Sequence, residues 1–299
     1  QAKTMKINII MNLLNILFSY LFIYGIDIKN AHGNFVIEGM SIAGAAIAIT
    51  LARIIGSVLF GIAMGEGAVM KWQHMKHWVL VDMKMQRAIM GVGLPTGMES
   101  FIFNVGKFVQ QTMIITLGTV ALASNTIAWS VFGLLIVPGN AFSIVATTLV
   151  GYYIGQGNME EGRRINLYLM KLATVIKIVI SVIVFPLAGL IVGIYSKDPE
   201  VIRLTSIIIC MNAIAIPLLW PASFLIPSGL RGAGDTKYTM VISIISLWVF
   251  RVGLGYILSI TLHFGIIGLW SAMYFDWIAR GAFYLTRLAS KKWAKHAVV

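Results

Sequence analysis

The sequence predicts an all-α integral membrane protein with about eight transmembrane helices, and its composition is the first observation that indicates this class. Hydrophobic residues make up 59% of the 299 residues, and the mean hydropathy is +0.87. Charged residues make up 11%, against roughly 25% in a soluble domain, which is too few to cover a soluble protein's surface. The apolar residues also form continuous runs, without the alternation typical of transmembrane strands.

These observations exclude several classes of function, including soluble enzymes, secreted domains and disordered tails. The net charge is +12, but the charges lie between the apolar runs, so we assign them to membrane orientation and expect no nucleic acid partner. The single cysteine, Cys210, excludes a disulfide within the chain. Motifs of phosphate-binding loops, zinc proteases and serine hydrolases do not occur. We therefore expect no enzyme activity, no cofactor and no metal site.

Eight segments are long enough to cross a bilayer core, which needs about 20 mostly apolar residues per helix. The expected helices are 6–26, 41–64, 88–118, 122–154, 166–195, 203–229, 238–260 and 264–288. The first two form one expected unit over 1–64. A polar stretch over 65–87 then leads to a six-helix unit over 88–290, and a basic tail over 291–299 follows.

The distribution of Lys and Arg predicts the orientation of the spans. Of the 23 basic residues, 15 flank spans on one side, and Lys29, Lys197 and Arg203 lie on the other. The remaining five fall inside spans: Arg53, Lys107, Lys177, Arg251 and Arg280. Because cytoplasmic loops carry the excess of basic residues, we expect both termini on the cytoplasmic side of a multi-pass protein in the cell (inner) membrane.

The first span carries Asn8, Asn12 and Asn15 at spacings of four and three. This spacing places the three amides on one face of the helix. One interpretation is hydrogen bonding between helices, and the other is that this face lines a cavity.

The span 88–118 carries polar side chains that are candidates for ion coupling or for lining a cavity. They are Glu99, Asn104, Lys107, Gln110 and Gln111. An ionisable group at a helix centre in lipid costs at least about 2.5 kcal/mol, so these groups are expected to face protein or water. Glu99 and Lys107 are eight residues apart, about 12 Å along a helix, so each needs another partner. We interpret Glu99 as a group that binds a cation or proton and Lys107 as its distant countercharge or a switchable group; structural ion pairs are the alternative.

Two later spans carry three more ionisable candidates. Arg251 lies near the middle of 238–260, and Asp276 and Arg280 lie in 264–288. Asp276 and Arg280 are four residues apart and can therefore pair on one helix face. Such a pair either holds the bundle together or belongs to the ion-coupling site.

Six of the seven prolines lie in the expected spans: Pro95, Pro138, Pro186, Pro217, Pro221 and Pro227. Each removes a helical hydrogen bond and permits a kink. Pro217, Pro221 and Pro227 share one helix, which is therefore predicted to be bent or broken. Several bent helices in one six-helix unit favour a transporter that opens and closes.

A weak internal repeat indicates two parallel halves. Thr4-Met5 and Thr239-Met240 each open a span, which leads through a short outer loop to a glycine-rich helix with an internal arginine, Arg53 or Arg280. If spans one and two correspond to spans seven and eight, roughly four helices precede them in a protein of two six-helix repeats. We therefore expect this chain to be the C-terminal two-thirds of such a protein.

Several stretches, taken in their order and spacing, resemble the MATE (multidrug and toxic compound extrusion) transporters, and the resemblance extends over essentially the whole chain. The stretches are IAGAAIA at 42–48, GVGLPTGME at 91–99, GTVALASN at 118–125 with Pro138, GYYIGQG at 151–157, LRGAGDT at 230–236, and GLWSAMYFDWIAR at 268–280 with Trp293. LRGAGDT is the most specific of them.

The resemblance implies twelve helices in two six-helix lobes around a central cavity, of which this chain carries the last two helices of one lobe and all of the second. It also implies the export of organic cations and other amphipathic compounds in exchange for sodium or protons. The chain departs from the family pattern at two acidic positions, because Phe103 and Asn104 stand near one, and Trp220 and Pro221 occupy the region of the other. The coupling ion cannot therefore be transferred from the family.

The sequence thus predicts a secondary multidrug antiporter that works by alternating access, with small-molecule drugs or organic cations and the lipid bilayer as partners, and a monomeric state. Arg231, Asp235 and Lys237 are interpreted as a structural cytoplasmic connection. One alternative is a flippase of related fold for lipid-linked oligosaccharides, since Lys107 and Arg251 could contact a pyrophosphate. The other alternative is an inactive fragment.

Overall fold

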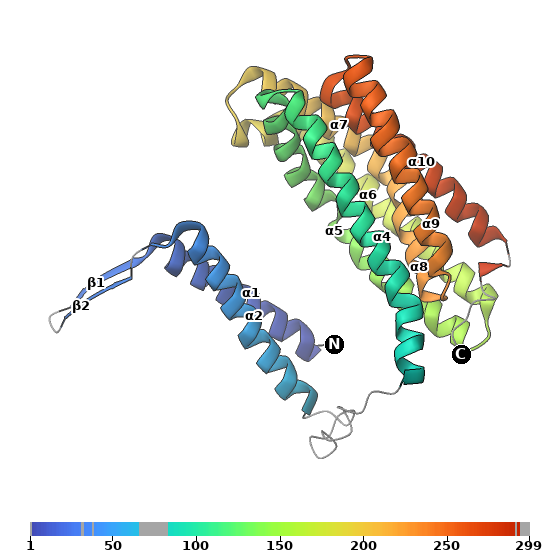
Figure 1. Cartoon of the computed structure of the whole chain (residues 1–299), viewed down its shortest axis with the longest axis horizontal. Helices are drawn as coiled ribbons and strands as arrows, with labels where there is room; N and C mark the ends of the chain where they lie inside the picture. The colour runs from blue at the N-terminus through green and yellow to red at the C-terminus, as the bar shows by residue number, and fades with distance from the viewer. Residues whose placement is uncertain (1, 31–32, 38, 66–82, 291, 294–299) are drawn as a thin grey trace. The chain divides into compact units, whose positions relative to one another are not determined.

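The computed structural model describes residues 2–30, 33–37, 39–65, 83–290 and 292–293. The chain divides into two compact units, Gln1–Met83 and Lys84–Val299, which Figure 1 shows as a helical hairpin and a bundle. Residues 66–82 of the expected connection and residues 294–299 of the expected tail lie outside the described residues.

The first unit contains α1 (Ala2–Tyr24) and α2 (Ser41–Gly65). Two short antiparallel strands join them, β1 (Ile26–Asn30) and β2 (Gly33–Ile37). The sequence did not predict this hairpin, whose strands are shorter than the 9–11 residues that cross a bilayer. The two helices approach closely where Gly44 meets the backbone of Phe22 and Gly56 meets Met11, because small residues let helix backbones come together.

The second unit is a bundle of helices, some of which contain π-helical segments. Its elements are α4 (Met83–Thr116), α5 (Thr119–Gly155), α6 (Met159–Tyr195), α7 (Pro199–Trp220), η2 (Pro221–Leu225), α8 (Ile226–Gly232), α9 (Thr236–Ser246), η3 (Leu247–Leu254), η4 (Ile257–Thr261) and α10 (Gly265–Ala289). Each of the eight expected spans is therefore helical.

Within the described part of the chain, six helices are long and apolar enough to cross a membrane. They are Lys3–Tyr24, Ser41–Ala63, Thr119–Gly155, Met159–Tyr195, Pro199–Gly232 and Thr236–Thr261. The expected spans in α4 and α10 do not reach the same hydropathy, because α4 carries Glu99 and Lys107 among several amides and α10 carries Asp276 and Arg280.

Some helices begin well before the predicted apolar segments. The helix predicted from residue 166 starts at Met159, because the Asn158 side chain accepts a hydrogen bond from the Glu161 amide at 3.1 Å. Glu160 and Glu161 also lie in the first turn, where negative charge complements the helix dipole. Capping therefore decides where this helix starts, whereas hydropathy marks only its apolar part.

The proline-rich helix is altered at Pro221 rather than broken. The chain runs from α7 through the π-helical turn η2, which begins at Pro221, into α8 without a loop. Proline cannot donate the usual helical hydrogen bond, and a π-turn accommodates the local mismatch. Ser223 in η2 donates to the Trp277 carbonyl of α10 at 2.5 Å, so the altered turn is packed against the neighbouring helix.

Aromatic side chains make the centre of the second unit. Phe132 of α5 stacks on Trp277 of α10 with ring centres 6.0 Å apart, and Trp220 stacks on Phe224 at 5.2 Å. Burying such large rings supplies much of the packing in a helical interior. This aromatic core fixes α5, α7, η2 and α10 relative to one another.

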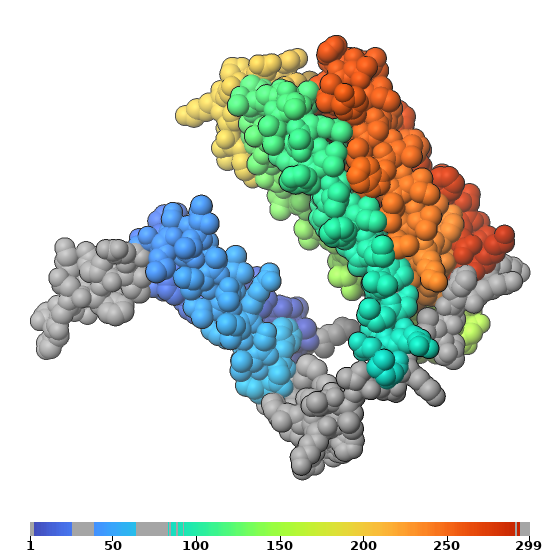
Figure 2. Space-filling model, viewed as in Figure 1, coloured from blue at the N-terminus to red at the C-terminus, as the bar shows by residue number. Residues whose placement is uncertain are grey.

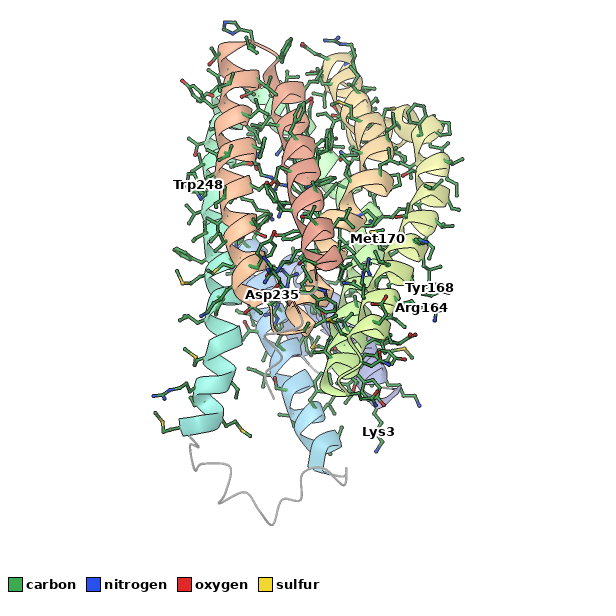
Figure 3. The ribbon with its side chains drawn as sticks, turned by 90° about the vertical axis from the view of Figure 1, so that its right-hand side faces the viewer. Lys3, Arg164, Tyr168, Met170, Asp235 and Trp248 are labelled. Atoms are coloured by element: carbon green, nitrogen blue, oxygen red, sulfur yellow. The ribbon has the colours of Figure 1, made fainter. Side chains whose placement is uncertain are left out.

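An ion pair joins the connection between α8 and α9 to α10. Asp235 lies between α8 and α9 (Figure 3), and its carboxylate lies 2.7 Å from Nε of Arg287 in α10. The Arg287 guanidinium also lies over the Tyr238 ring at 4.5 Å. Both contacts therefore join this connection to α10.

α4 lies along one face of the second unit beside α9 and η3 (Figure 2). α4 lies close to η3 at Gly106, where an added Cβ would meet the Leu247 side chain. On either side of this contact, two cavities separate α4 from the rest of the bundle. These cavities contain the candidate functional residues.

Candidate functional site

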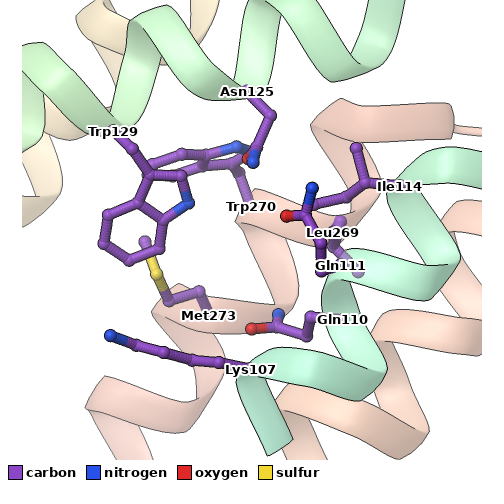
Figure 4. Close-up of a pocket in the computed structure, with 9 residues that line it drawn as sticks. All are labelled: Lys107, Gln110, Gln111, Ile114, Asn125, Trp129, Leu269, Trp270 and Met273. Atoms are coloured by element: carbon purple, nitrogen blue, oxygen red, sulfur yellow. The ribbon is translucent and has the colours of Figure 1, made fainter. Parts of the chain in front are cut away.

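Two cavities lie beneath α4. The first, of about 240 Å³, is drawn in Figure 4 and is lined by Lys107, Gln110, Gln111, Ile114, Asn125, Trp129, Leu269, Trp270 and Met273. The second, of about 410 Å³, is lined by Thr96, Glu99, Ser100, Phe103, Asn104, Lys107, Ser223, Phe224, Pro227, Arg231, Ser243 and Arg280. Lys107 lines both cavities, and the other predicted residues of α4 each line one of the two.

Glu99 connects α4 to two other helices. Its Oε1 accepts a hydrogen bond from Ser243 Oγ at 2.7 Å and lies 3.5 Å from Arg231 Nη1. Its Oε2 is buried without a hydrogen-bond partner among the described residues. Arg231 was interpreted as part of a structural cytoplasmic connection, and the structure places it in the last turn of α8, in the lining of the second cavity.

The hydrogen-bonded chain continues beyond Ser243. Ser243 Oγ lies 2.7 Å from the Tyr284 hydroxyl. Because the single proton of Ser243 is donated to Glu99, the Tyr284 hydroxyl is the donor left for this contact, and it also has the Thr239 carbonyl at 3.0 Å as an acceptor. Elements α4, α9 and α10 therefore meet in one polar network, and any change in the charge of Glu99 acts directly on it.

Lys107 has aromatic neighbours instead of a carboxylate. Its Nζ lies 5.2 Å from the centre of the Phe103 ring and 5.6 Å from that of Trp129. No carboxylate lies within ion-pair distance of it in the part of the chain that the structure describes. The prediction that Glu99 and Lys107 do not pair is confirmed, and the aromatic rings supply a weaker electrostatic attraction.

Asp276 forms the predicted ion pair with Arg280 and a second one with Arg251. Its Oδ2 lies 2.7 Å from Arg280 Nη2 and 3.2 Å from Arg251 Nη2, and its Oδ1 accepts a hydrogen bond from Ser246 Oγ at 2.6 Å. All three ionised side chains are buried. Arg251 lies in the π-helical segment η3, so this cluster joins η3 to α10.

The predicted amides of α4 fall into two groups. Asn104 lines the second cavity and donates to the Ser100 carbonyl of its own helix at 2.8 Å. Gln110 and Gln111 line the first cavity. Asn125 of α5 joins them there, as Figure 4 shows. Asn125 was not predicted as a site residue, although it lies in the GTVALASN stretch of the family resemblance.

The asparagines of α1 belong to the first unit. Asn8 and Asn12 line a groove of about 440 Å³ with Thr4, Met5 and Ile9. Asn12 donates to the Asn8 carbonyl at 2.9 Å, and Asn15 accepts from Ser19 at 3.3 Å. Both bonds remain within α1, so among the described residues these amides do not make the hydrogen bonds between helices that one interpretation predicted.

Lys177 is a buried ionisable residue for which the sequence suggested no role. Its side chain is only 1% exposed, its Nζ donates to the Leu135 carbonyl at 3.2 Å, and it lies 4.1 Å from the centre of the Trp220 ring. Gly139 makes room for Lys177 and Trp220, because a Cβ there would meet both side chains. The sequence contained one signal for this contact: Lys177 is a basic residue inside an expected span, and such a residue needs a partner within the protein.

The described residues contain no group of three or more His, Cys, Asp or Glu that could hold a metal ion. The oxygen atoms of Glu99 and Ser243 are hard ligands, which suit sodium or a proton better than a transition metal.

Comparison with known proteins identifies a family model and several transporters that are similar to this chain. The MatE family model matches residues 95–257. The chain is 27% identical over 288 residues to "Probable multidrug resistance protein NorM" of Thermotoga maritima, covering 96% of this chain and 60% of that protein. It is 26% identical over 292 residues to "Uncharacterized transporter YisQ" of Bacillus subtilis, covering 97% and 62%. The chain therefore spans about 60% of the length of these relatives.

Solved structures give the same fold. A crystal structure of MATE in the straight conformation aligns with a TM-score of 0.78 at 21% identity, over 95% of this chain and 62% of that one. An outward-facing MATE family transporter of the MOP superfamily aligns with a TM-score of 0.77 at 19% identity over the same shares. The all-α membrane fold predicted from the sequence is confirmed.

Proposed function

The chain belongs to the MatE family, and from this premise we propose that it is part of a secondary active multidrug antiporter, which exports organic cations or amphipathic compounds in exchange for sodium or protons. The observation that carries the proposal is the pair of cavities beneath α4, which share Lys107, together with Glu99 in the lining of the second cavity. The named relatives "Probable multidrug resistance protein NorM" and "Multidrug resistance protein MdtK" support the choice of cargo.

Ion coupling is assigned to Glu99. When a proton or sodium ion binds its carboxylate, the attraction to Arg231 at 3.5 Å weakens, and so does the network through Ser243. α4 then moves more easily relative to α8 and α9. Coupling to transport follows if the ion and the cargo favour different positions of α4, since a ligand shifts an equilibrium only by its differential affinity for the two states.

Three further features belong to the same proposal. The multi-pass protein lies in the cell membrane, both ends of this chain face the cytoplasm, and the protein acts as a monomer. The excess of Lys and Arg on one side of the spans supports the orientation.

The test is ethidium accumulation in a drug-sensitive bacterium that expresses the protein from its full reading frame. The sodium and proton gradients are collapsed separately. We expect lower accumulation that depends on one of the gradients, and this dependence identifies the ion. Glu99→Gln should abolish the gradient-dependent efflux at equal membrane abundance. Glu160→Gln is the matched control, because Glu160 is an exposed acid on α6 that makes only a surface ion pair with Arg163, and it should leave efflux unchanged.

Two outcomes would overturn parts of the proposal. Gradient-driven efflux that persists in Glu99→Gln removes the coupling role of Glu99 but keeps the transporter. Absence of efflux by the wild-type protein, when it is present in the membrane, removes the antiporter.

The second candidate function is a flippase for lipid-linked oligosaccharides, favoured by the basic side chains of Lys107, Arg231 and Arg280 around the second cavity. Liposomes that contain either a cationic dye or a lipid-linked sugar pyrophosphate separate the two functions, since only the flippase moves the sugar lipid between leaflets.

A further inference from the structure

Lys177 of α6 is a buried cation that the proposed transport mechanism does not use. Its side chain is fully buried, and no carboxylate lies within ion-pair distance of it among the described residues. It is not among the residues that line either of the described cavities beneath α4. Burying a charge without a counter-ion costs free energy, and an ionisable residue inside a membrane span is a candidate for a function. The contacts of the ammonium indicate what that function is.

The ammonium binds α5 in the turn that contains Pro138. Lys177 Nζ donates a hydrogen bond to the Leu135 carbonyl at 3.2 Å, three residues before the proline. A proline cannot donate the usual helical bond, and its ring clashes with the carbonyl four residues earlier, so a helix bends easily at this point. In membrane helices, neighbouring helices and side chains compensate for the backbone bonds that a proline weakens. Lys177 therefore supplies a donor from α6 to the weakened turn of α5.

The same ammonium lies over the ring of Trp220, the last residue of α7, at 4.1 Å from the ring centre. The two side chains meet beside Gly139, where an added Cβ would lie 2.5 Å from the Trp220 ring and 2.7 Å from Lys177 Cε. A cation over the face of a tryptophan is attracted to the ring, and most strongly where water is excluded. Lys177 therefore connects the Pro138 turn of α5 to the end of α7, directly before Pro221 and the π-helical turn η2.

From Trp220, a series of side chains leads to the second cavity. The Trp220 ring is stacked on the Phe224 ring of η2, with the ring centres 5.2 Å apart and the planes 20° apart. The Arg280 guanidinium of α10 lies 4.8 Å from the centre of the Phe224 ring. Phe224 and Arg280 both line the second cavity, and Arg280 pairs with Asp276 at 2.7 Å. The two stacked rings therefore lie between two cations, with Lys177 at one end and Arg280 at the other.

This series of contacts crosses four elements: α6, α7, η2 and α10. Close-packed protein interiors are nearly incompressible and transmit displacements. A change in the bend of α5 at Pro138 moves the Leu135 carbonyl, and with it the ammonium and the ring of Trp220. The Phe224 ring, which is stacked on Trp220, then changes its position in the wall of the second cavity.

We propose that Lys177 is a positioning residue for transport, which couples the bend of α5 at Pro138 to the lining of the second cavity through Trp220 and Phe224. The inference rests on the proposed transport function, and it adds a residue that acts on the cavity without lining it. Coupling between two sites is reciprocal. A change in the cavity wall at Phe224 therefore alters the bend of α5, just as a change in the bend alters the cavity wall.

The first experiment measures the bend of α5 by pulsed electron–electron double resonance between two spin labels on this helix. In a Cys210→Ser background, cysteines replace Thr126 and Thr148, two exposed residues whose hydroxyls bond to carbonyls of α5 itself. The labels lie on either side of Pro138, about 33 Å apart along a straight helix. A change in the bend therefore changes the measured distance. The full-length protein is used, in detergent.

We expect Lys177→Met to broaden the distribution of distances, because α5 loses its connection to α6 and α7 and samples more than one bend. Lys171→Met is the matched control, because Lys171 is an exposed lysine of the same helix, and it should leave the distribution unchanged. Ethidium efflux should fall in Lys177→Met by at least about fivefold at equal membrane abundance, which is the lower end of ordinary coupling between sites. A residue that only stabilises the fold would lower the melting temperature without broadening the distances in the folded protein.

A double-mutant cycle tests whether the coupling passes through the rings. Phe224→Leu alters the wall of the second cavity and should broaden the α5 distances on its own. In the Lys177→Met background it should add nothing, since residues that act through one connection are not additive. Trp220→Phe keeps a ring but weakens the attraction to the ammonium, and it should broaden the distances in the same direction. This variant also provides the test if Lys177→Met does not fold.

Unchanged distances in both Lys177→Met and Trp220→Phe, or fully additive effects of Lys177→Met and Phe224→Leu, would overturn the coupling. Unchanged efflux in Lys177→Met, with efflux present in the wild-type protein, would overturn the role in transport and leave the antiporter intact. Absence of wild-type efflux would instead refute the antiporter, and the distance measurements would still decide whether α5 is coupled to the cavity.

Discussion

Glu99 and Ser243 are joined by a hydrogen bond of 2.7 Å, although 144 residues separate them. This bond attaches α4 to α9 next to the second cavity, where α4 otherwise has few close neighbours. The ion pair with Arg231 adds a contact from α4 to α8. The same carboxylate therefore serves as an attachment point of α4 and as the group assigned to ion binding, so the two roles are coupled by geometry.

Replacing Ser243 with alanine should loosen this attachment without removing a charge. Ser243→Ala deletes the hydrogen bonds to Glu99 and Tyr284, and we expect the stability to fall by about 1–3 kcal/mol, as for a buried partner left unpaired. Thermal unfolding in detergent measures the loss. Ser130→Ala is the control, because Ser130 bonds only to the Thr126 carbonyl of its own helix; an equal loss in both variants would contradict a special role for Ser243.

The sequence predicted the helices well because long apolar runs in a membrane protein have few alternative structures. It also predicted the Asp276–Arg280 pair, since residues four apart on one helix must lie on one face. It could not identify Arg251 as the second partner of Asp276, or Arg231 as the partner of Glu99, because those contacts depend on how separate helices pack. Asn125 was missed for the same reason: one asparagine has no periodic signal, and only the packing of α5 beside α4 and α10 places it in the cavity.

The Asp276 cluster predicts an asymmetry between its members. Asp276→Asn leaves Arg251 and Arg280 buried without a counter-ion, and breaking a buried pair in this way costs about 3–5 kcal/mol. Arg280→Met removes one of two cations that share the carboxylate, and Arg251 still lies 3.2 Å from it. We therefore expect Arg280→Met to be clearly less destabilising than Asp276→Asn, as measured by melting temperature and yield in the membrane.

The reverse order would contradict this account. If Arg280→Met unfolds the protein while Asp276→Asn does not, the packing of the Arg280 guanidinium over the Phe224 ring, at 4.8 Å, contributes more than its charge.

Gly139 should tolerate no side chain. A Cβ at this position would meet the Trp220 ring and the Lys177 side chain, so Gly139→Ala forces both to move and should destabilise by about 1–3 kcal/mol, as overpacking does. Gly133→Ala is the matched control on the same helix, because nothing lies within 4 Å of its added Cβ. That variant should be neutral or stabilising by up to about 1 kcal/mol, since alanine favours helix over glycine. Equal melting temperatures for the two variants would show that the Trp220–Lys177 contact can move freely.

Lys177 allows a direct test of what its buried ammonium contributes. The group has one hydrogen bond to Leu135 and one ring contact with Trp220, and no carboxylate pairs with it among the described residues. Removing a charge from water costs several kcal/mol per ion, whereas a hydrogen bond to a charged group returns about 1.5–3 kcal/mol and a desolvated ring contact about 2 kcal/mol. The stabilisation from these two contacts is therefore close to the free-energy cost of burying the ammonium.

Lys177→Met keeps the length of the side chain and removes the charge, so we expect a melting temperature equal to or above that of the wild-type protein. Lys171→Met, on the exposed side of the same helix, controls for the change in helix propensity. A loss of several degrees in Lys177→Met alone would mean that the contacts of the ammonium with Leu135 and Trp220 stabilise the fold by more than its burial costs. If instead stability is retained while ethidium efflux falls, the ammonium contributes to the movement of α5 relative to α6 and α7 and not to folding. A group with a structural role alone would change stability and transport together.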